Sequence, residues 1–180
     1  MKSTTSHRFL AYIAFGVCTA LAVFAATNAP QENKPTTIIF VRHAEKAAVT
    51  GDDPPLSEAG IKRAAALRHV LEKSGVSAIY ATQYQRTKQT VEPLAQALKI
   101  PITQIDAKST EILVAQIREK HRGATVVVAG HSNTVPAIIK ALGAAEAPAI
   151  ADDVFDNFFV LTIAEKSPAR LLHLRYGAAD

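Results

Sequence analysis

The chain has 180 residues, of which 48% are hydrophobic and 20% are charged, a balance that fits one folded domain and argues against a disordered chain. Its formal net charge is +4, but Lys2 and Arg8 lie in an N-terminal segment without which 18 basic residues face 16 acidic ones. That excess is too small and too evenly spread to indicate a nucleic-acid partner.

The first 26 residues are predicted to direct the protein out of the cytoplasm. Basic residues precede an uncharged apolar run over residues 9–26, in which Val23-Phe24-Ala25 fits a small-residue cleavage site. We expect a secretory signal peptide, or alternatively an uncleaved N-terminal membrane anchor. Residues 27–35 form a polar linker and residues 36–180 the domain. The domain is therefore expected to be exported, periplasmic or otherwise extracytoplasmic, with membrane contact only if the segment is retained.

The only cysteine, Cys18, lies inside that N-terminal segment. Disulfides, thiol nucleophiles and thiolate metal sites are therefore excluded from the domain. The sequence also has no repeat, no heptad array and no Cys/His metal spacing.

Runs of β-branched and aromatic residues alternate along the domain with segments whose apolar residues recur at helical spacing. Strands are predicted at residues 37–41, 76–81, 100–105, 125–129, 157–164 and 170–176. Helices are predicted at residues 57–73, 86–99, 110–122 and 134–142.

This alternation predicts a three-layer αβα sandwich on a mostly parallel sheet. The short turn at residues 166–168 makes the last two strands an antiparallel pair at a sheet edge. No connection is long enough to form a lid domain.

Charged and ionisable residues follow directly on three of the predicted strands. Arg42 and His43 follow the first, His131 follows Gly130 after the fourth, and Arg86 lies in the first turn of the helix after the second. The carboxyl ends of parallel strands share one rim, so these side chains are expected to converge. Two arginines and two histidines make a positive pocket suited to a phosphoryl group.

These residues resemble the histidine phosphatase (phosphoglycerate mutase-like) superfamily. The matching elements are Arg42-His43-Ala44-Glu45, the helix start at Leu56-Ser57, Thr82 with Arg86-Thr87 and Thr90, and Gly130-His131-Ser132-Asn133. The resemblance implies a phosphatase in which His43 is the nucleophile and forms a phosphohistidine. It further implies that Arg42, Arg86 and His131 bind the phosphate, that His131 donates in the transition state, and that no metal or cofactor is required.

The general acid that protonates the leaving group is not evident. Asp106 and Glu111 resemble the spacing of the family's acid, which nominates Glu111, but the glycines that usually follow that acid are absent. Glu111 has an equally simple interpretation as a surface acid in a helix first turn. Asp52, Asp53 and Glu58 are the other candidates. If none serves, phosphohistidine or a phosphoramidate is the better substrate.

The remaining ionisable residues have structural interpretations. We expect His69, His121 and His173 to be structural or solvated. Glu45 and Lys46 form either a salt-bridged pair at the rim or substrate contacts, and Tyr84 either lines the pocket or covers its helix.

The leading hypothesis is thus an exported phosphatase acting on a phosphorylated small molecule, an envelope sugar phosphate or a phosphoprotein. A mutase is disfavoured because the segments that would close its site are missing. The alternatives are a non-catalytic phosphate-binding or scaffold protein that retains the pocket, and a metal site built on His43 and His131.

Overall fold

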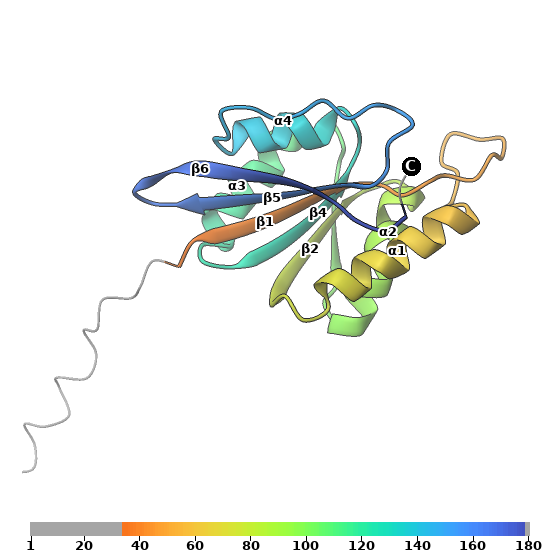
Figure 1. Cartoon of the computed structure of the whole chain (residues 1–180), viewed down its shortest axis with the longest axis horizontal. Helices are drawn as coiled ribbons and strands as arrows, with labels where there is room; N and C mark the ends of the chain where they lie inside the picture. Colours follow the sequence, from red (N-terminus) through yellow and green to blue (C-terminus); the bar gives the residue numbers. More distant parts are fainter. Residues whose placement is uncertain (1–33, 179–180) are drawn as a thin grey trace, which may run out of the picture. The chain divides into compact units, whose positions relative to one another are not determined.

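The computed structural model describes residues 34–178 (Figure 1). The predicted signal peptide or anchor, Cys18 and nearly all of the predicted linker lie outside the described residues. The strands are β1 (Thr36–Arg42), β2 (Val76–Thr82), β3 (Ile102–Ile105), β4 (Thr125–Gly130), β5 (Asn157–Ala164) and β6 (Ser167–Arg175). The helices are α1 (Glu58–Leu71), α2 (Gln85–Leu98), α3 (Thr110–Lys120) and α4 (Thr134–Ala141). Within residues 34–178, no helix is both long and apolar enough to cross a membrane.

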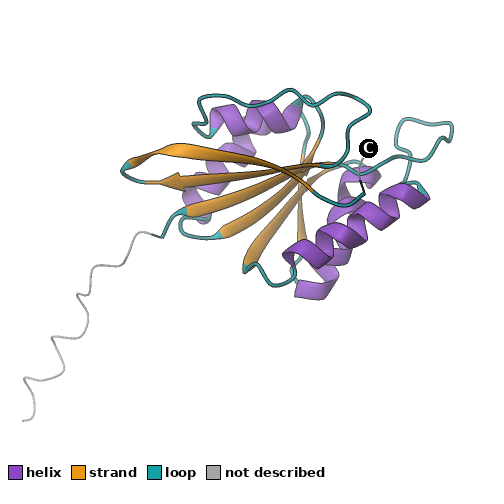
Figure 2. Cartoon of the chain, in the orientation of Figure 1, coloured by secondary structure: helices purple, strands orange, loops and turns teal. Residues whose placement is uncertain are grey.

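The strands form one six-stranded sheet in the order β3-β2-β4-β1-β5-β6. β3, β2, β4 and β1 run parallel to one another, whereas β5 is antiparallel to β1 and β6 is antiparallel to β5. The predicted fold, a mostly parallel sheet with an antiparallel edge, is confirmed (Figure 2).

Helices cover both faces of the sheet, and each face has its own core. On one face, α3 and α4 pack against the sheet around Phe40, Val128 and Phe159. On the other, α1 and α2 pack around Val41 and Val127. Residues 38–41 of β1 and 126–129 of β4 alternate between the two cores, which is why these segments are apolar at every position. The result is the three-layer sandwich that the sequence predicts.

Two predicted boundaries shift for local reasons. β3 begins at Ile102 because Ile100 still belongs to the end of α2, where its N–H donates to the Ala95 carbonyl after a left-handed Lys99. β6 begins at Ser167 and includes Pro168, so the hairpin turn contains only Glu165 and Lys166. A proline is tolerated here because β6 is an edge strand.

Glu45 pairs with Arg63 of α1, so of the two interpretations left open for Glu45 and Lys46, the salt-bridged rim pair is wrong. Arg63 donates to both Glu45 carboxylate oxygens at 2.8–3.1 Å, and its side chain is only 3% exposed. The same guanidinium donates to the carbonyls of Tyr176 and Ala178. Glu45 therefore anchors α1 and the C-terminal segment to the loop after β1, while Lys46 pairs its backbone with Leu56.

This anchoring role predicts that Glu45→Ala lowers the free energy of unfolding by about 3 kcal/mol, because it leaves a buried guanidinium without its carboxylate. Glu72→Ala is the matched control. Glu72 pairs with the exposed Arg68, and its loss is expected to cost less than about 0.5 kcal/mol. Urea unfolding measures both. A large loss of activity with unchanged stability would instead place Glu45 in the catalytic machinery.

Candidate active site

The pairing of β1 with β4 brings His43 and His131 together. The two strands are in register up to Arg42 and Gly130, and the His43 N–H donates to the Gly130 carbonyl at 2.9 Å. Each histidine thus directly follows the end of its strand, and their ring centroids lie 5.4 Å apart. Gly130 is required here because a β-carbon would clash with Thr134 Oγ1 and Val135 at the start of α4.

The orientation of the His43 ring is fixed by a hydrogen bond at one of its two nitrogens, Nδ1. Nδ1 lies 2.8 Å from the Ala44 carbonyl oxygen, which can only accept, so Nδ1 carries the hydrogen. Ala44 is itself fixed, since its N–H donates to Thr90 Oγ1 at 2.8 Å. In the neutral ring, Nε2 therefore presents a lone pair, as a nucleophile requires.

Burial and positive neighbours keep both histidines neutral. The pKa of His43 is lowered from 6.5 to about 4, mainly by burial and also by the positive charges of Arg42, His131 and Arg86, while its hydrogen bond with the Ala44 carbonyl opposes the shift. Burial, followed by Arg86 and Arg42, lowers the pKa of His131 to about 4 as well. At neutral pH both imidazole rings are therefore uncharged.

The lowered pKa values predict that the protein loses stability in mild acid. The unfolded chain takes up protons on these histidines near pH 6.5, whereas the folded chain does so only near pH 4. The stabilisation is complete above about pH 6.5 and is lost as the pH falls towards about 4. For the buried His43 the loss approaches about 3 kcal/mol, and it is smaller for His131, which solvent screens. Urea unfolding at a series of pH values, with His43→Gln for comparison, measures it. An equal acid dependence in that variant would contradict the assignment.

Each arginine of the site stacks on an aromatic ring and is tied to a loop. The Arg42 guanidinium lies 4.3 Å from the ring of Phe155, and its Nη1 donates to the carbonyls of Ala151 and Val154 at 2.9 and 3.0 Å. The Arg86 guanidinium lies 4.3 Å from the ring of Tyr84. Stacking and hydrogen bonding fix the planes of both guanidinium groups before any ligand arrives.

The same two rings also flank the histidines. Phe155 lies 6.0 Å from the ring of His43, and Tyr84 lies 5.3 Å from that of His131. Of the two interpretations of Tyr84, the one in which it lines the site is therefore the one that the structure supports. Sequence reasoning missed Phe155, because the loop before β5 carries no motif.

Asp53 supports Arg86 from the loop between β1 and α1. Its carboxylate accepts from the Gln85 N–H at 2.8 and 3.1 Å, at the start of α2, and lies 3.6 Å from Arg86 Nη1. Tyr84, the N-cap residue, offers no side-chain cap, so Asp53 satisfies the helix N-terminus instead. Because its carboxylate is engaged by the Gln85 N–H and by Arg86, Asp53 has a structural role.

Glu111 forms no hydrogen bond with either histidine. Glu111 is exposed in the first turn of α3. Asp52 and Glu58 are exposed as well, and Asp106 accepts from the Lys108 N–H. Among residues 34–178, no carboxylate forms a hydrogen bond with His43 or His131. The geometry therefore brings together Arg42, His43, Arg86 and His131, without a carboxylic acid bonded to either imidazole.

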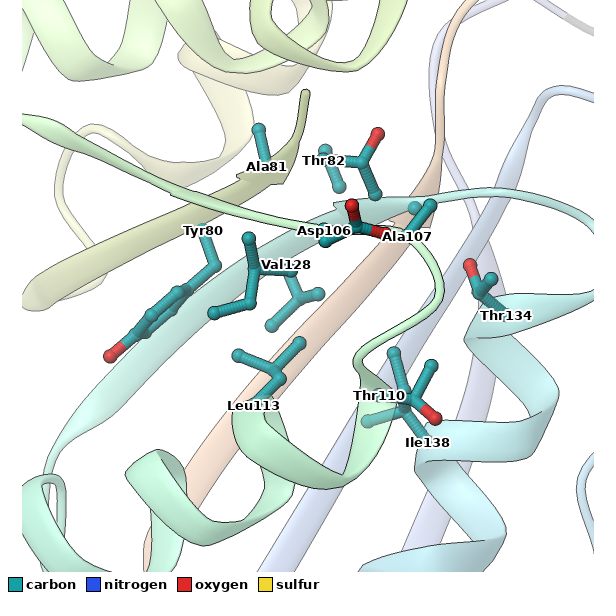
Figure 3. Close-up of a pocket in the computed structure, with 13 residues that line it drawn as sticks. Tyr80, Ala81, Thr82, Asp106, Ala107, Thr110, Leu113, Val128, Thr134 and Ile138 are labelled. Atoms are coloured by element: carbon teal, nitrogen blue, oxygen red, sulfur yellow. The ribbon is translucent and has the colours of Figure 1, made fainter. Parts of the chain in front are cut away.

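A small cavity lies behind the strand ends, bordered by β2, β4, α3 and α4 (Figure 3). Its wall is almost entirely apolar, although Thr82, Asp106, Thr110 and Thr134 are among the residues that border it. Its volume of about 10 Å³ is too small for a substrate and close to what one water molecule needs.

An open groove lies between the start of α4 and the loop before β5, beside Ser132 and Asn133, which follow His131 in the sequence. Its volume is about 390 Å³, and it is lined by Ser132, Asn133, Pro136, Ala147, Ala149 and Ile150. No group of three or more His, Cys, Asp or Glu side chains in the described part of the chain is arranged to hold a metal ion.

Comparison with known proteins finds a matching family model and solved structures with a similar fold. The family model of the histidine phosphatase superfamily (branch 1) matches residues 38–111. No curated protein matches the sequence.

Solved structures share the fold over most of their length. The protein histidine phosphatase SixA, solved in complex with tungstate, is 18% identical with a TM-score of 0.62, and the match covers 77% of this chain and 96% of SixA. An Agrobacterium tumefaciens protein, described as a candidate phosphohistidine phosphatase SixA, is 25% identical with a TM-score of 0.58 and coverage of 79% and 99%. A mycobacterial glucosyl-3-phosphoglycerate phosphatase is 14% identical, with a TM-score of 0.64 and coverage of 80% and 100%.

Proposed function

Because this chain belongs to the histidine phosphatase superfamily, we propose that it is a phosphatase that works through a phosphohistidine on His43. The observation that carries this proposal is the state of the His43 ring. Its Nδ1–H is held by the Ala44 carbonyl, and its burial among cationic groups keeps Nε2 unprotonated at neutral pH. Such a nitrogen is ready to attack phosphorus without a separate base.

In the first step, Nε2 of His43 forms a bond to phosphorus while the bond to the leaving group breaks. Arg42 and Arg86 bind the non-bridging oxygens, and His131 supplies a further contact as negative charge redistributes. In the second step, water attacks the phosphohistidine, which releases inorganic phosphate and returns His43 to its neutral form. None of these steps requires a metal ion, so a strong chelator is expected to leave activity unchanged.

A phosphohistidine or another phosphoramidate suits this site best. An alkoxide leaving group needs a proton from an acid, whereas the nitrogen of a phosphoramidate is itself easily protonated. No carboxylate is hydrogen-bonded to His43 or His131 in the described part of the chain. SixA, to which the fold is similar, is a protein histidine phosphatase by name.

The groove lined by Ser132 and Asn133, the residues that follow His131, supports a substrate that extends beyond its phosphoryl group. The groove is open, and its lining residues include no lysine or arginine. A second phosphate, as in a bisphosphorylated sugar, would find no cationic partner there. We therefore favour a phosphorylated protein segment over a sugar bisphosphate, with simple phosphomonoesters as slower substrates.

A substrate panel tests this proposal. We expect the purified protein to hydrolyse a phosphohistidine-bearing protein with a kcat/KM at least about tenfold above that for an alkyl phosphate. The reverse order would contradict the phosphoramidate preference. If neither substrate were hydrolysed, the second candidate function, a non-catalytic phosphate-binding protein, would be favoured. The absence of a carboxylate bonded to His43 or His131 in the described part of the chain is the observation behind that candidate.

Glu111 was predicted as the general acid, and its exposure argues for the structural interpretation. We expect Glu111→Gln to change kcat/KM by less than about threefold for both p-nitrophenyl phosphate and an alkyl phosphate. Glu119→Gln, on the exposed side of the same helix, is the control. A selective loss of alkyl phosphate hydrolysis in Glu111→Gln would restore Glu111 as the acid.

We also propose that residues 1–26 export the protein to the periplasm or another extracytoplasmic compartment. The support is the apolar run that follows basic residues. Fractionation of the producing cells and N-terminal sequencing of the mature protein test both the location and cleavage against the anchor alternative.

A further inference from the structure

Two buried threonine hydroxyls link the first turn of α2 to the ring of His131. Thr82 Oγ1 lies 3.0 Å from His131 Nε2 and 2.8 Å from Thr87 Oγ1. Thr87 Oγ1 lies 2.8 Å from the Tyr84 carbonyl oxygen and 3.1 Å from that of Thr82. Thr87 is fully buried and Thr82 is 5% exposed, so bulk water does not compete for these bonds.

The positions of the hydrogens in this series of hydrogen bonds can be assigned by counting donors. Each hydroxyl has one hydrogen, and a carbonyl oxygen can only accept. Thr87 therefore donates to the carbonyls, Thr82 donates to Thr87, and the lone pair of Thr82 is left for His131 Nε2. The opposite direction would leave Thr87 close to two carbonyl oxygens with no hydrogen between them, which is costly in a buried place.

We propose that Thr82 and Thr87 hold His131 as its Nε2–H tautomer, so that Nδ1 is the nitrogen that takes up a proton when an oxyanion binds. The neutral ring then offers the anion a lone pair at Nδ1. His131 can donate a hydrogen bond to the anion from that atom only once a proton has been added. Binding of a phosphoryl dianion is thereby coupled to proton uptake, and Thr82 is a positioning residue.

The charges around His131 determine when the proton arrives. Arg86 on α2, Arg42 at the end of β1, and the rings of His43 and Tyr84 surround it. In the empty site the two guanidinium groups disfavour a further positive charge. A bound dianion offsets the charge of the two guanidinium groups and favours the protonated His131 ring. His131 therefore takes up a proton when the anion binds. This inference rests on the proposed phosphatase function only in that the bound anion is taken to be a phosphoryl group.

The test uses tungstate, a phosphate-like dianion that the related SixA binds in its solved structure. Calorimetric titration in buffers of different ionisation enthalpy, near pH 7, counts the protons taken up per tungstate. We expect about one for the wild type and for Thr82→Ser, and less than about half for Thr82→Val. Thr87→Val removes the hydroxyl that is farther from His131, and its proton uptake is expected to lie between these two values.

Nitrogen-15 NMR of the histidine rings, with His131→Gln to assign the signals, gives a second readout. The wild type and Thr82→Ser are expected to show the Nε2–H tautomer, and Thr82→Val a mixture of both. Unchanged tautomer and unchanged proton uptake in both valine variants would overturn the proposal. Because neither readout requires turnover, this result is distinguishable from a failure of the phosphatase function.

Discussion

Replacement of His43 by alanine is expected to reduce kcat by at least about 10⁴-fold, the largest effect of any single change in the domain. The reason is that His43 supplies the only attacking atom, so the variant loses the covalent route altogether. The fold is expected to survive, since a buried neutral imidazole is removed and no charge is left unpaired.

His69 offers a matched control, because it is an exposed histidine on α1. His69→Asn is expected to leave kcat within about twofold of the wild type. Added imidazole is expected to restore part of the activity of His43→Ala by occupying the space of the lost ring. Substantial turnover by His43→Ala without imidazole would contradict the assignment of the nucleophile.

Removal of the Arg86 guanidinium is expected to have the next largest effect. Arg86→Ala should lower kcat/KM by about 10²–10³-fold, because a positioned cation that binds the phosphoryl oxygens is lost. Arg86→Lys keeps the charge but loses the two-pronged donor geometry and the stacking on Tyr84, and should still lose at least about tenfold.

Lys88→Ala, two residues further along α2, is the control for a general change in positive charge. Tungstate affinity should fall in parallel with kcat/KM in both Arg86 variants and stay unchanged in Lys88→Ala. If Arg86→Ala bound tungstate as tightly as the wild type, Arg86 would not be part of the phosphate site. Arg42 is a less clean target, since it also holds the loop carbonyls of Ala151 and Val154.

The fold and the convergence of four side chains, Arg42, His43, Arg86 and His131, could be predicted because their signals are local. Continuous apolar runs marked β1 and β4, and a shorter run at residues 78–81 marked β2. The polar residues that follow these runs lie at one rim because parallel strands share it. The helix start at Ser57 was equally readable, and its hydroxyl accepts from the Gly60 N–H as an N-cap does.

The parts that could not be predicted depend on contacts between distant segments. Asp53 and Phe155 lie in loops whose sequences carry no motif, and their roles arise only when those loops meet Arg86 and Arg42. Glu45 and Lys46 are adjacent in an extended segment, where neighbouring side chains point in opposite directions, so Glu45 finds Arg63 instead.

The most direct test of the account is the chemical nature of the phosphorylated enzyme. The protein is incubated briefly with a radiolabelled phosphodonor, and the denatured product is then treated with acid or with alkali. We predict that the wild type is labelled, that the label is lost in acid and retained in alkali as a phosphohistidine requires, and that His43→Ala carries none. A label that survives acid, or persists in His43→Ala, would contradict the mechanism.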